Sequence, residues 1–443
     1  MATILGLKLP ATATAPFCPS EVEGSIAVPA RATVLKRIAR LAGPGLLVAV
    51  GYMDPGNWAT DIAAGSGYGY DLMFVVVGAS LAAMLLQSLA LRIGMASGLD
   101  LAQACRQRYG RIPNVTLWLL AEIAIIATDV AEVLGGALAI KLLIGLPLWA
   151  GIILTAFDML LVVGLKGRGF RQVEAIVGAL VATITLCFLI ELLMVPPDPH
   201  ALAAGLVPDL TRLAQPGALA IAIGIVGATV MPHNLYLHSS IVQTRTIPAD
   251  PVEKRRAIRL ANVDSAAALT LAMLVNGAIL ALAAGAFHAH GATNVAAIDD
   301  AYRLLSPVTG AKAAALFFGI ALLASGQSST FTGTIAGQVV LEGFLRLKIP
   351  CWQRRIITRG IAIVPAMLGV IAWGDHGVGP LLVLSQIILS LQLPFAVWPL
   401  IRIASDAKLM GALAVRLPTQ AMAWALFAII ATANLWLLAS LIG

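Results

Sequence analysis

Long apolar runs joined by short polar loops make up the chain from about residue 45 to its end. Each run is close to the roughly 20 apolar residues that a helix needs to cross a bilayer. Prolines and glycines punctuate the loops, as at Pro196–Pro197 and Gly374–Asp375. The pattern predicts an all-α polytopic membrane protein with about 11 transmembrane helices, at about residues 45–65, 71–95, 114–139, 146–165, 172–195, 217–241, 260–286, 310–341, 356–374, 379–402 and 420–442.

The composition agrees with a chain that faces lipid. Of the 443 residues, 59% are hydrophobic and 12% are charged, whereas a soluble domain has about 45–50% and about 25%. The net charge of +7 is dispersed among the loops rather than gathered into the patch that binds nucleic acid. The four cysteines form no C-x-x-C pair, which argues against a zinc site or a disulfide framework. Residues 1–43 lack the apolar segment of a cleavable leader, and we expect a short, weakly ordered cytoplasmic tail.

The basic residues predict the orientation, because Lys and Arg are concentrated in cytoplasmic loops. If the amino terminus is cytoplasmic, all but four of the 29 Lys and Arg residues fall in the tail and in loops on the same side. The four on the other side are Lys141, Arg212, Arg303 and Lys312. We expect a cell inner membrane location, with the amino terminus in the cytoplasm and the carboxyl terminus outside.

Two of the predicted helices are interrupted in mid-membrane. The first run contains Gly51–Trp58, which reads G-Y-M-D-P-G-N-W, and the sixth contains Gly227–Asn234, which reads G-A-T-V-M-P-H-N. Proline removes a backbone donor and clashes with the preceding turn, and the carbonyls that it frees need partners away from lipid. Burying Asp54 costs at least about 2.5–3.5 kcal/mol in a membrane helix. Unwound segments facing an internal cavity account for both features.

The two interruptions match each other. Both read x-Pro-x-Asn, with Asp54 at the position of Met231 and Asn57 at the position of Asn234. Their places in the first and sixth runs predict inverted repeats of five helices, at about 45–195 and 217–402, within a transporter domain over residues 44–443. The run at about 420–442 is an extra helix. Paired broken helices in matching halves indicate the midplane site of a transporter.

The side chains at these interruptions indicate what the site binds. Asp54 offers a charged oxygen and Asn57 a neutral one, and the backbone carbonyls of Ala228 and Gly51 could complete the ligand shell. Met231 adds a thioether, a soft donor that suits borderline transition metals, whereas calcium and magnesium prefer oxygen alone. The set favours manganese(II), iron(II) and neighbouring ions.

These motifs resemble the Nramp family of proton-coupled divalent-metal transporters. Asp54–Asn57 and Met231–Asn234 are similar to its two signature segments, while Gly326–Gln338 resembles its transport signature and Asp129–Val133 its third span. The resemblance covers roughly residues 40–440. The resemblance implies the leucine-transporter fold, with broken helices 1 and 6. It also implies that the metal ligands are Asp54, Asn57, Met231 and the backbone carbonyls of Ala228 and Gly51. Family members that carry magnesium depart from the pattern at the aspartate and the methionine, which argues against magnesium here.

The third predicted helix, at about residues 114–139, contains Asp129 and Glu132. These residues lie on one helical face, because they are three residues apart. Buried carboxylates and histidines mark proton relays in transporters. The resemblance implies that His233, Asp129 and Glu132 form such a route, with Arg354 and Arg355 at its cytoplasmic end. The sequence alone leaves open that the two arginines only belong to a basic cytoplasmic loop.

Each of the other polar residues in the predicted helices could have either of two roles. Gln386, Asn276 and Asn234 could line the ion path, or they could make hydrogen bonds between helices. The His288–His290 stretch, which reads H-A-H, is expected to lie in a solvated loop rather than to gather metal.

The sequence thus predicts a secondary active importer of manganese(II) and iron(II), coupled to protons, with no permanently bound cofactor and no enzymatic activity. Its expected partners are metal ions, protons and the lipid bilayer, and a monomer would suffice. The main alternative is a sodium-coupled amino-acid or amine transporter of the same fold, which would not need Met231. A passive cation channel would show no dependence on a pH gradient, and an intramembrane metalloprotease would carry H-E-x-x-H, which this sequence lacks.

Overall fold

The computed structural model describes residues 2–4, 7–9, 23–29, 33–158, 170–293, 295, 298–302, 312–347, 349 and 351–442. Within these residues, nine helical segments are long and apolar enough to cross a membrane. They are α5 (Met73–Ser97), α7 (Arg111–Ile144), α10 (Phe170–Met194), the consecutive pair α12 (Ala218–Thr229) and α13 (Pro232–Ile241), α14 (Pro251–Ala286), α16 (Lys312–Leu345), α17 (Cys351–Trp373), α18 (Val378–Ala404) and α20 (Leu417–Ile442).

The two remaining predicted runs also begin as helices. The run at 45–65 folds as two shorter helices, α3 (Pro44–Gly51) and α4 (Pro55–Tyr68). The run at 146–165 begins as α8 (Leu148–Thr155) and the 3-10 turn η1 (Ala156–Asp158), and the rest of it lies outside the described residues. The described helices therefore follow the predicted runs in order.

One helix extends well beyond its apolar part. The predicted run began near residue 260, whereas α14 begins at Pro251. The Asp250 carboxylate caps this helix by accepting a hydrogen bond of 3.0 Å from the backbone N–H of Glu253, and proline is well suited to the first helical position. The added turns are polar, and a search for apolar runs therefore does not detect them.

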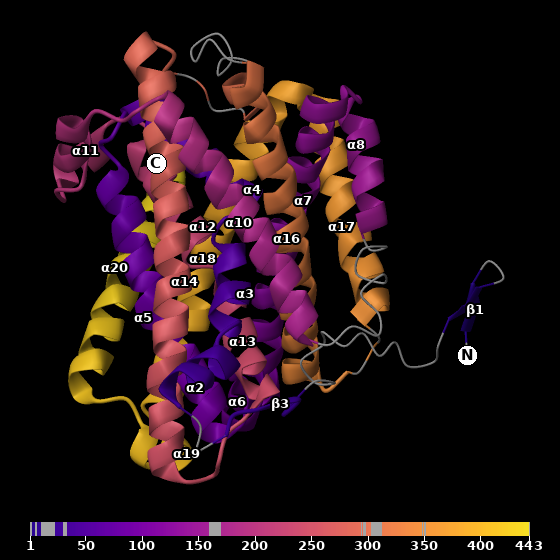
Figure 1. Ribbon diagram of the computed structural model, residues 1–443, viewed down its shortest axis with the longest axis vertical. Helices are drawn as coiled ribbons and strands as arrows, with labels where there is room; N and C mark the ends of the chain where they lie inside the picture. Colours follow the sequence, from indigo (N-terminus) through magenta and orange to yellow (C-terminus); the bar gives the residue numbers. More distant parts are fainter. Residues whose placement is uncertain are drawn as a thin grey trace.

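The broken helices lie at the centre of the bundle. α4 packs along α14, α12 along α18, and α7 along α16. Figure 1 shows α3, α12 and α13 in the middle, with α20 along one flank. Apolar side chains of the central helices form one large buried cluster, while α17 and α20 expose side chains such as Leu368, Ile371 and Trp436. This pattern is that of a bundle with an inner and an outer layer of helices.

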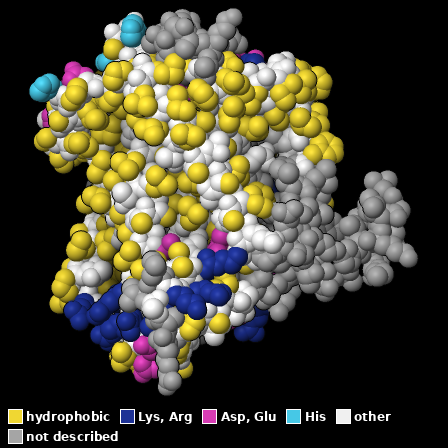
Figure 2. Space-filling view, viewed as in Figure 1, with side chains coloured by type: hydrophobic (Ala, Val, Ile, Leu, Met, Phe, Trp, Pro, Cys, Tyr) yellow, Lys and Arg dark blue, Asp and Glu magenta, His cyan; other side chains and the backbone are white. Residues whose placement is uncertain are grey.

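Short elements close the two ends of the bundle. α2 (Val34–Leu41), α6 (Leu101–Arg108) and α19 (Ala407–Met410) lie at one end, and α11 (Pro199–Gly205) lies at the other (Figure 1). Lys and Arg side chains gather at the end of α2 and α19, which we call the basic end, and the histidines in view lie opposite (Figure 2). The other short elements are η2 (Leu210–Ala214), η3 (Val242–Thr244), η4 (His288–His290), η5 (Asp375–Gly377), η6 (Gly411–Leu413) and the antiparallel strands β1 (Ala2–Ile4) and β2 (Leu7–Leu9).

Part of the amino-terminal tail docks on the bundle, and the expectation of a weakly ordered tail is wrong for this part. The strand β3 (Ile26–Ala27) pairs in parallel with β4 (Arg245–Thr246), just after α13. Ile26 and Val28 are buried in apolar clusters of the bundle. The apolar burial and the backbone hydrogen bonds together fix a segment that was expected to be part of a weakly ordered tail.

Candidate functional site

The first helix break spans Tyr52 to Asp54, between α3 and α4. Pro55 is the first residue of α4, where its missing N–H costs nothing. The Asp54 carboxylate caps this helix by accepting a hydrogen bond of 2.8 Å from the backbone N–H of Asn57. The proline and the aspartate therefore end one helix and begin the next.

The carbonyls freed at this break find partners inside the protein. The Asn276 amide of α14 donates to the Tyr52 carbonyl over 2.9 Å. The Met53 carbonyl accepts from the Trp58 indole N–H over 3.2 Å and from the Ser325 hydroxyl over 2.5 Å. Backbone groups at membrane depth must be satisfied in this way, since lipid offers no partners. The unwound segment is therefore held by α14, α16 and its own helix α4.

The second break lies at Val230 and Met231, between α12 and α13. Pro232 begins α13, as Pro55 begins α4, and the two breaks share this construction. Met231 occupies the cap position, and its own side chain makes no capping hydrogen bond to the described backbone of α13. Val230 has a φ of −104° and a ψ of 60°, outside the helical region. The chain is thereby unwound directly before His233 and Asn234.

The Asn57 side chain joins the two breaks. Its amide nitrogen lies 2.7 Å from Asp54 Oδ1, 3.1 Å from the Ala228 carbonyl and 3.5 Å from the Gly51 carbonyl. The structure therefore brings together four of the five groups that the sequence predicts as metal ligands. Asp54 and Asn57 are almost completely buried. Among the described residues, no group donates a hydrogen bond to Asp54 Oδ2.

Met231, the fifth predicted ligand, is also buried at the breaks. Its sulfur lies 3.6 Å from the Asn234 amide nitrogen. The same nitrogen would lie 2.3 Å from a Cβ atom placed on Gly51, so the Asn234 amide fits between the thioether and the first break. The Met231 side chain also belongs to a small apolar cluster with Ala124, Ala127 and Leu389.

Gln386 of α18 contacts both broken helices. Its side-chain amide nitrogen would lie 1.8 Å from a Cβ on Gly56, and its backbone carbonyl oxygen would lie 2.0 Å from a Cβ on Gly227. The absence of a side chain at both glycines thus lets α18 approach the site. Asn276 makes interhelical hydrogen bonds, to Tyr52 as above and to Asn57 Oδ1 over 3.3 Å. Gln386, Asn276 and Asn234 all adjoin the predicted metal-binding groups.

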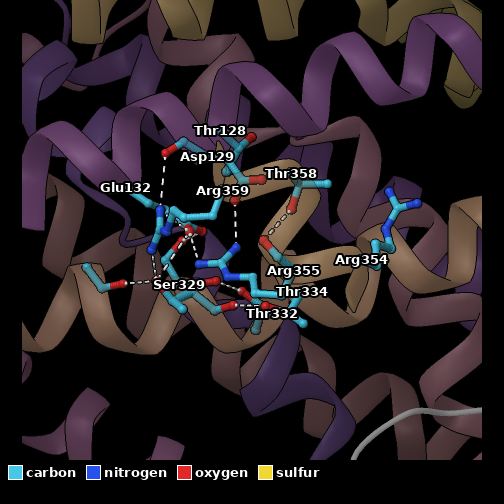
Figure 3. Close-up of polar contacts among 12 residues, drawn as sticks. Thr128, Asp129, Glu132, Ser329, Thr332, Thr334, Arg354, Arg355, Thr358 and Arg359 are labelled. Atoms are coloured by element: carbon cyan, nitrogen blue, oxygen red, sulfur yellow. Dashed lines mark hydrogen bonds and ion pairs between the residues drawn. The ribbon is translucent and has the colours of Figure 1, made fainter. Parts of the chain in front are cut away.

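A buried charged cluster lies between α7, α16 and α17 (Figure 3). Arg355 lies at its centre. One guanidinium nitrogen of Arg355 is 2.7 Å from Asp129 Oδ1, and another is 3.2 Å from Glu132 Oε2. Arg359 lies 3.7 Å from Glu132, which also accepts a hydrogen bond of 2.9 Å from the Ser329 hydroxyl. Burial of several charges is tolerated because each carboxylate has a cation and hydrogen-bond donors nearby. Of the residues predicted to form a proton route, Asp129, Glu132 and Arg355 thus lie in contact with one another.

Arg354 differs from its neighbour Arg355. Figure 3 shows its side chain directed away from the cluster, and it pairs with Glu122 at 2.8 Å. Glu122 precedes Asp129 by seven residues on α7, which is about 10 Å towards the basic end. Neither the pairing of Glu122 nor the place of Arg359 in the cluster was predicted from the sequence, in which Arg359 falls among the basic residues assigned to loops. The i, i+4 spacing of Arg355 and Arg359 on one helix face is the signal that could have identified the second.

His233 is the second residue of α13 and follows Met231 by two positions. Its side chain is buried. Among the described residues, no hydrogen bond reaches its Nδ1, and no hydrogen bond or ion pair links it to the Asp129 and Glu132 cluster. Asp129 of the cluster nevertheless lies close enough to act electrostatically on the His233 ring. His288 and His290 lie in η4, which follows the carboxyl end of α14, and are exposed, as expected for a solvated loop.

Two broken helices whose breaks meet at buried carboxylate, amide and carbonyl groups define this chain as a polytopic membrane protein with the leucine-transporter fold. The solved structure of MhsT in complex with L-phenylalanine shares this fold, with a TM-score of 0.60 and 14% identity, over 90% of this chain and 98% of that chain. The family model described as natural resistance-associated macrophage protein-like, Nramp, matches residues 45–440. The chain belongs to the Nramp family.

Relatives of this family match nearly the whole length of the chain. The divalent metal cation transporter MntH 1 of Pseudomonas aeruginosa is 60% identical over 433 residues, which are 97% of this chain and 98% of that protein. A crystal structure of a mutant of the Eremococcus coleocola manganese transporter is 38% identical with a TM-score of 0.88, covering 95% of this chain and 90% of that chain. The resemblance seen in the motifs is thereby confirmed at the level of the family and the fold.

Proposed function

We propose that this protein imports divalent transition-metal ions, manganese(II) and iron(II), in symport with protons. The observation that carries the proposal is the convergence of the Asp54 carboxylate, the Asn57 amide and the carbonyls of Gly51 and Ala228 at the two helix breaks. A carboxylate and several neutral oxygens in a buried site suit a divalent cation. The names of the relatives above, a divalent metal cation transporter and a manganese transporter, agree with this cargo.

Met231 gives the proposed site its preference among divalent cations. Its sulfur is within reach of the site through the Asn234 amide, which it contacts at 3.6 Å. A thioether contributes little to binding calcium or magnesium, and it favours softer ions such as manganese(II) and iron(II). A sodium-coupled transporter of organic solutes would have no use for this sulfur, which makes that alternative the weaker one.

The proposed proton route uses the charged cluster on α7 and α17, with His233 on the side of the metal site. Asp129 and Glu132 share Arg355 in a buried network, and Arg354 with Glu122 lies nearer the basic end. Carboxylates in such surroundings are typical of proton relays in transporters. A divalent ion entering a negative-inside cell already gains about 4.6 kcal/mol per 100 mV, and protons would add a dependence on the pH gradient.

The proposed orientation places the basic end in the cytoplasm of a bacterial inner membrane. Lys and Arg side chains gather there (Figure 2), as the positive-inside rule requires for cytoplasmic loops. The amino-terminal strand β3 and helix α2 lie at this end (Figure 1). The last helix, α20, begins near the same end and runs away from it, so the carboxyl terminus would lie outside. Transport would proceed by alternating access, with the ion held between α3, α4, α12 and α13.

The test is metal uptake into liposomes that contain the purified protein, followed by the quenching of an entrapped dye by manganese, with and without an inward proton gradient. Asp54→Ala should abolish uptake, because it removes the only formal charge among the proposed ligands. The control Asp209→Ala changes an exposed aspartate at the end of the bundle away from the site and should leave uptake unchanged. Manganese uptake at the wild-type rate by Asp54→Ala would refute the site.

A second variant tests the role of the thioether. Met231→Ala should retain part of the manganese uptake and admit more calcium, because the remaining ligands are all oxygens. Met73→Ala is the matched control, since Met73 is equally buried but lies in α5 within another apolar cluster. Uptake that requires sodium and an organic solute would support the alternative transporter, and uptake insensitive to the proton gradient would support a channel.

A further inference from the structure

Two concavities adjoin on the outer, lipid-facing side of the bundle near its basic end. The first is an apolar groove of about 520 Å³ between α7, α18 and α20, lined by Ile112, Thr116, Phe395, Trp398 and Phe427 among others. Its walls are stiff, because Trp398 packs edge-on against Trp424 at 4.9 Å and against Phe427 at 5.5 Å between ring centroids. Phe395 and Trp398 remain about half exposed.

The second concavity is a basic pocket of about 530 Å³ beyond the groove. It is lined by Arg108 at the end of α6, Arg402 near the end of α18 and Lys408 of α19, together with Asp406 and Gln420. Asp406 pairs with Arg108 and also accepts a hydrogen bond of 2.9 Å from the backbone N–H of Lys408. These two donors lower the pKa of the Asp406 carboxyl, which keeps it ionised. Three cations and one carboxylate leave the pocket positive.

The groove and the pocket lie next to each other along the same helices. Trp398 of the groove and Arg402 of the pocket are four residues apart on α18, which is about 6 Å along the helix. On α20, Phe427 lines the groove and Gln420 the pocket, about 10 Å apart. Pro394, at the far end of the groove, lies about 12 Å from Arg402, which is less than half of a hydrocarbon core of about 30 Å. The site therefore spans a single leaflet.

The far end of the groove is closed by a contact between α18 and α20. Pro394 has no backbone N–H, and the Ser390 carbonyl that would otherwise accept it receives the Asn434 amide instead, at 2.8 Å. The Ser390 hydroxyl also donates to Asn434 Oδ1 over 3.0 Å. The two helices are thereby tied together away from the basic end and leave the groove open towards the pocket.

We propose that this site binds an anionic glycerophospholipid, with acyl chain in the groove and phosphate against Arg402 and Lys408. Tryptophan at the level of the headgroups and basic residues just beyond it match the two halves of such a molecule. Arginine and lysine bind phosphate oxygens well, and the exposed Arg402 and Lys408 can turn towards the pocket. A zwitterionic lipid fits less well, because its own cation would face the same basic side chains.

The experiment is native mass spectrometry of the purified, delipidated protein with phosphatidylglycerol or phosphatidylcholine of identical acyl chains. The wild type should retain phosphatidylglycerol at least about tenfold more than phosphatidylcholine. Arg402→Gln/Lys408→Gln should lose this preference, whereas Arg256→Gln/Arg259→Gln should keep it. The control removes two exposed basic residues from α14, outside the site. Equal retention of phosphatidylglycerol by both double variants would overturn the proposal.

Two further arms separate a lipid from other occupants. Thr116→Trp, which fills the groove, should reduce phosphatidylglycerol binding, whereas Thr270→Trp on the exposed face of α14 should not. Inorganic phosphate should not raise the apparent melting temperature of the wild type as phosphatidylglycerol does. An equal rise with phosphate would overturn the lipid assignment in favour of a simple anion site. A wild type that binds no lipid, and dimerises in a way that Arg402→Gln/Lys408→Gln abolishes, would assign this face to a second copy.

Discussion

Gly227 sets how closely α12 approaches α18, and Gly227→Ala tests this approach. A Cβ at this position would lie 2.0 Å from the Gln386 carbonyl oxygen and 2.8 Å from the backbone nitrogen of Ser390. Both atoms belong to the backbone, and no side-chain rotation can move them away. The helices must separate by about 1.4 Å to reach 3.4 Å, the lower end of ordinary contact.

The expected cost follows from this overlap. Overpacking of this kind costs about 1–3 kcal/mol, and the better helix propensity of alanine offsets up to about 1 kcal/mol of it. Gly78→Ala is the matched control, since Gly78 also lies inside a described helix and a Cβ there meets no described atom within 4 Å. We expect Gly227→Ala to lower the apparent melting temperature by a few degrees and Gly78→Ala to leave it unchanged or raise it.

The assay is thermal unfolding of the purified protein in detergent, combined with manganese uptake in liposomes. Because Gly227 lies directly before Ala228, a separation of α12 from α18 displaces a proposed ligand, and uptake should fall with stability. Gly56→Ala provides a contrast, because the three atoms nearest to its Cβ all belong to the Gln386 side chain rather than to backbone, the amide nitrogen being nearest at 1.8 Å. If Gly227→Ala behaved like Gly78→Ala in both assays, the close approach of the two helices would have no energetic importance.

Two further predictions concern the buried polar groups. Arg355→Gln should destabilise the protein by about 3–5 kcal/mol, since it leaves two buried carboxylates without their shared cation. Arg354→Gln removes a single pair, and its partner Glu122 keeps 15% of its side-chain surface exposed, so it should cost less; equal melting temperatures would contradict this difference. Asn276→Leu should raise the manganese concentration for half-maximal uptake at a stability cost of about 1 kcal/mol, because it frees the Tyr52 carbonyl and one contact of Asn57. Unchanged uptake by Asn276→Leu would show that this amide does not position the site.

The helix breaks could be predicted from the sequence because their causes are local. Proline, an aspartate and a matching asparagine all fall within eight residues, and their cost in a membrane is independent of the rest of the fold. The convergence of Asp54, Asn57 and the Ala228 carbonyl agrees with that prediction. The assignment of these groups as metal ligands, and of a proton route, stays a prediction.

The pairings across helices could not be predicted in the same way. Arg354 and Glu122 are 232 residues apart, and the sequence does not show which of two adjacent arginines faces which carboxylate. The docked strand at Ile26 escaped notice because a two-residue strand has no periodicity. Polar helix extensions, such as the first turns of α14, fall outside any apolar run and need the cap residue Asp250 to be recognised.

The Asn57 amide has a consequence for which ions the proposed site would admit. Its nitrogen now donates towards three oxygens, from Asp54, Ala228 and Gly51. An ion that coordinates those oxygens must displace the amide nitrogen and turn the Asn57 carbonyl inward, against the Asn276 amide that holds it. Each hydrogen bond that breaks costs about 0.5–1.5 kcal/mol. Binding of an ion would therefore have to offset a few kcal/mol of lost hydrogen bonding. A divalent cation, which binds these oxygens strongly, would offset this cost far more easily than a monovalent ion. The proposed site would therefore favour divalent over monovalent cations even without the Met231 thioether.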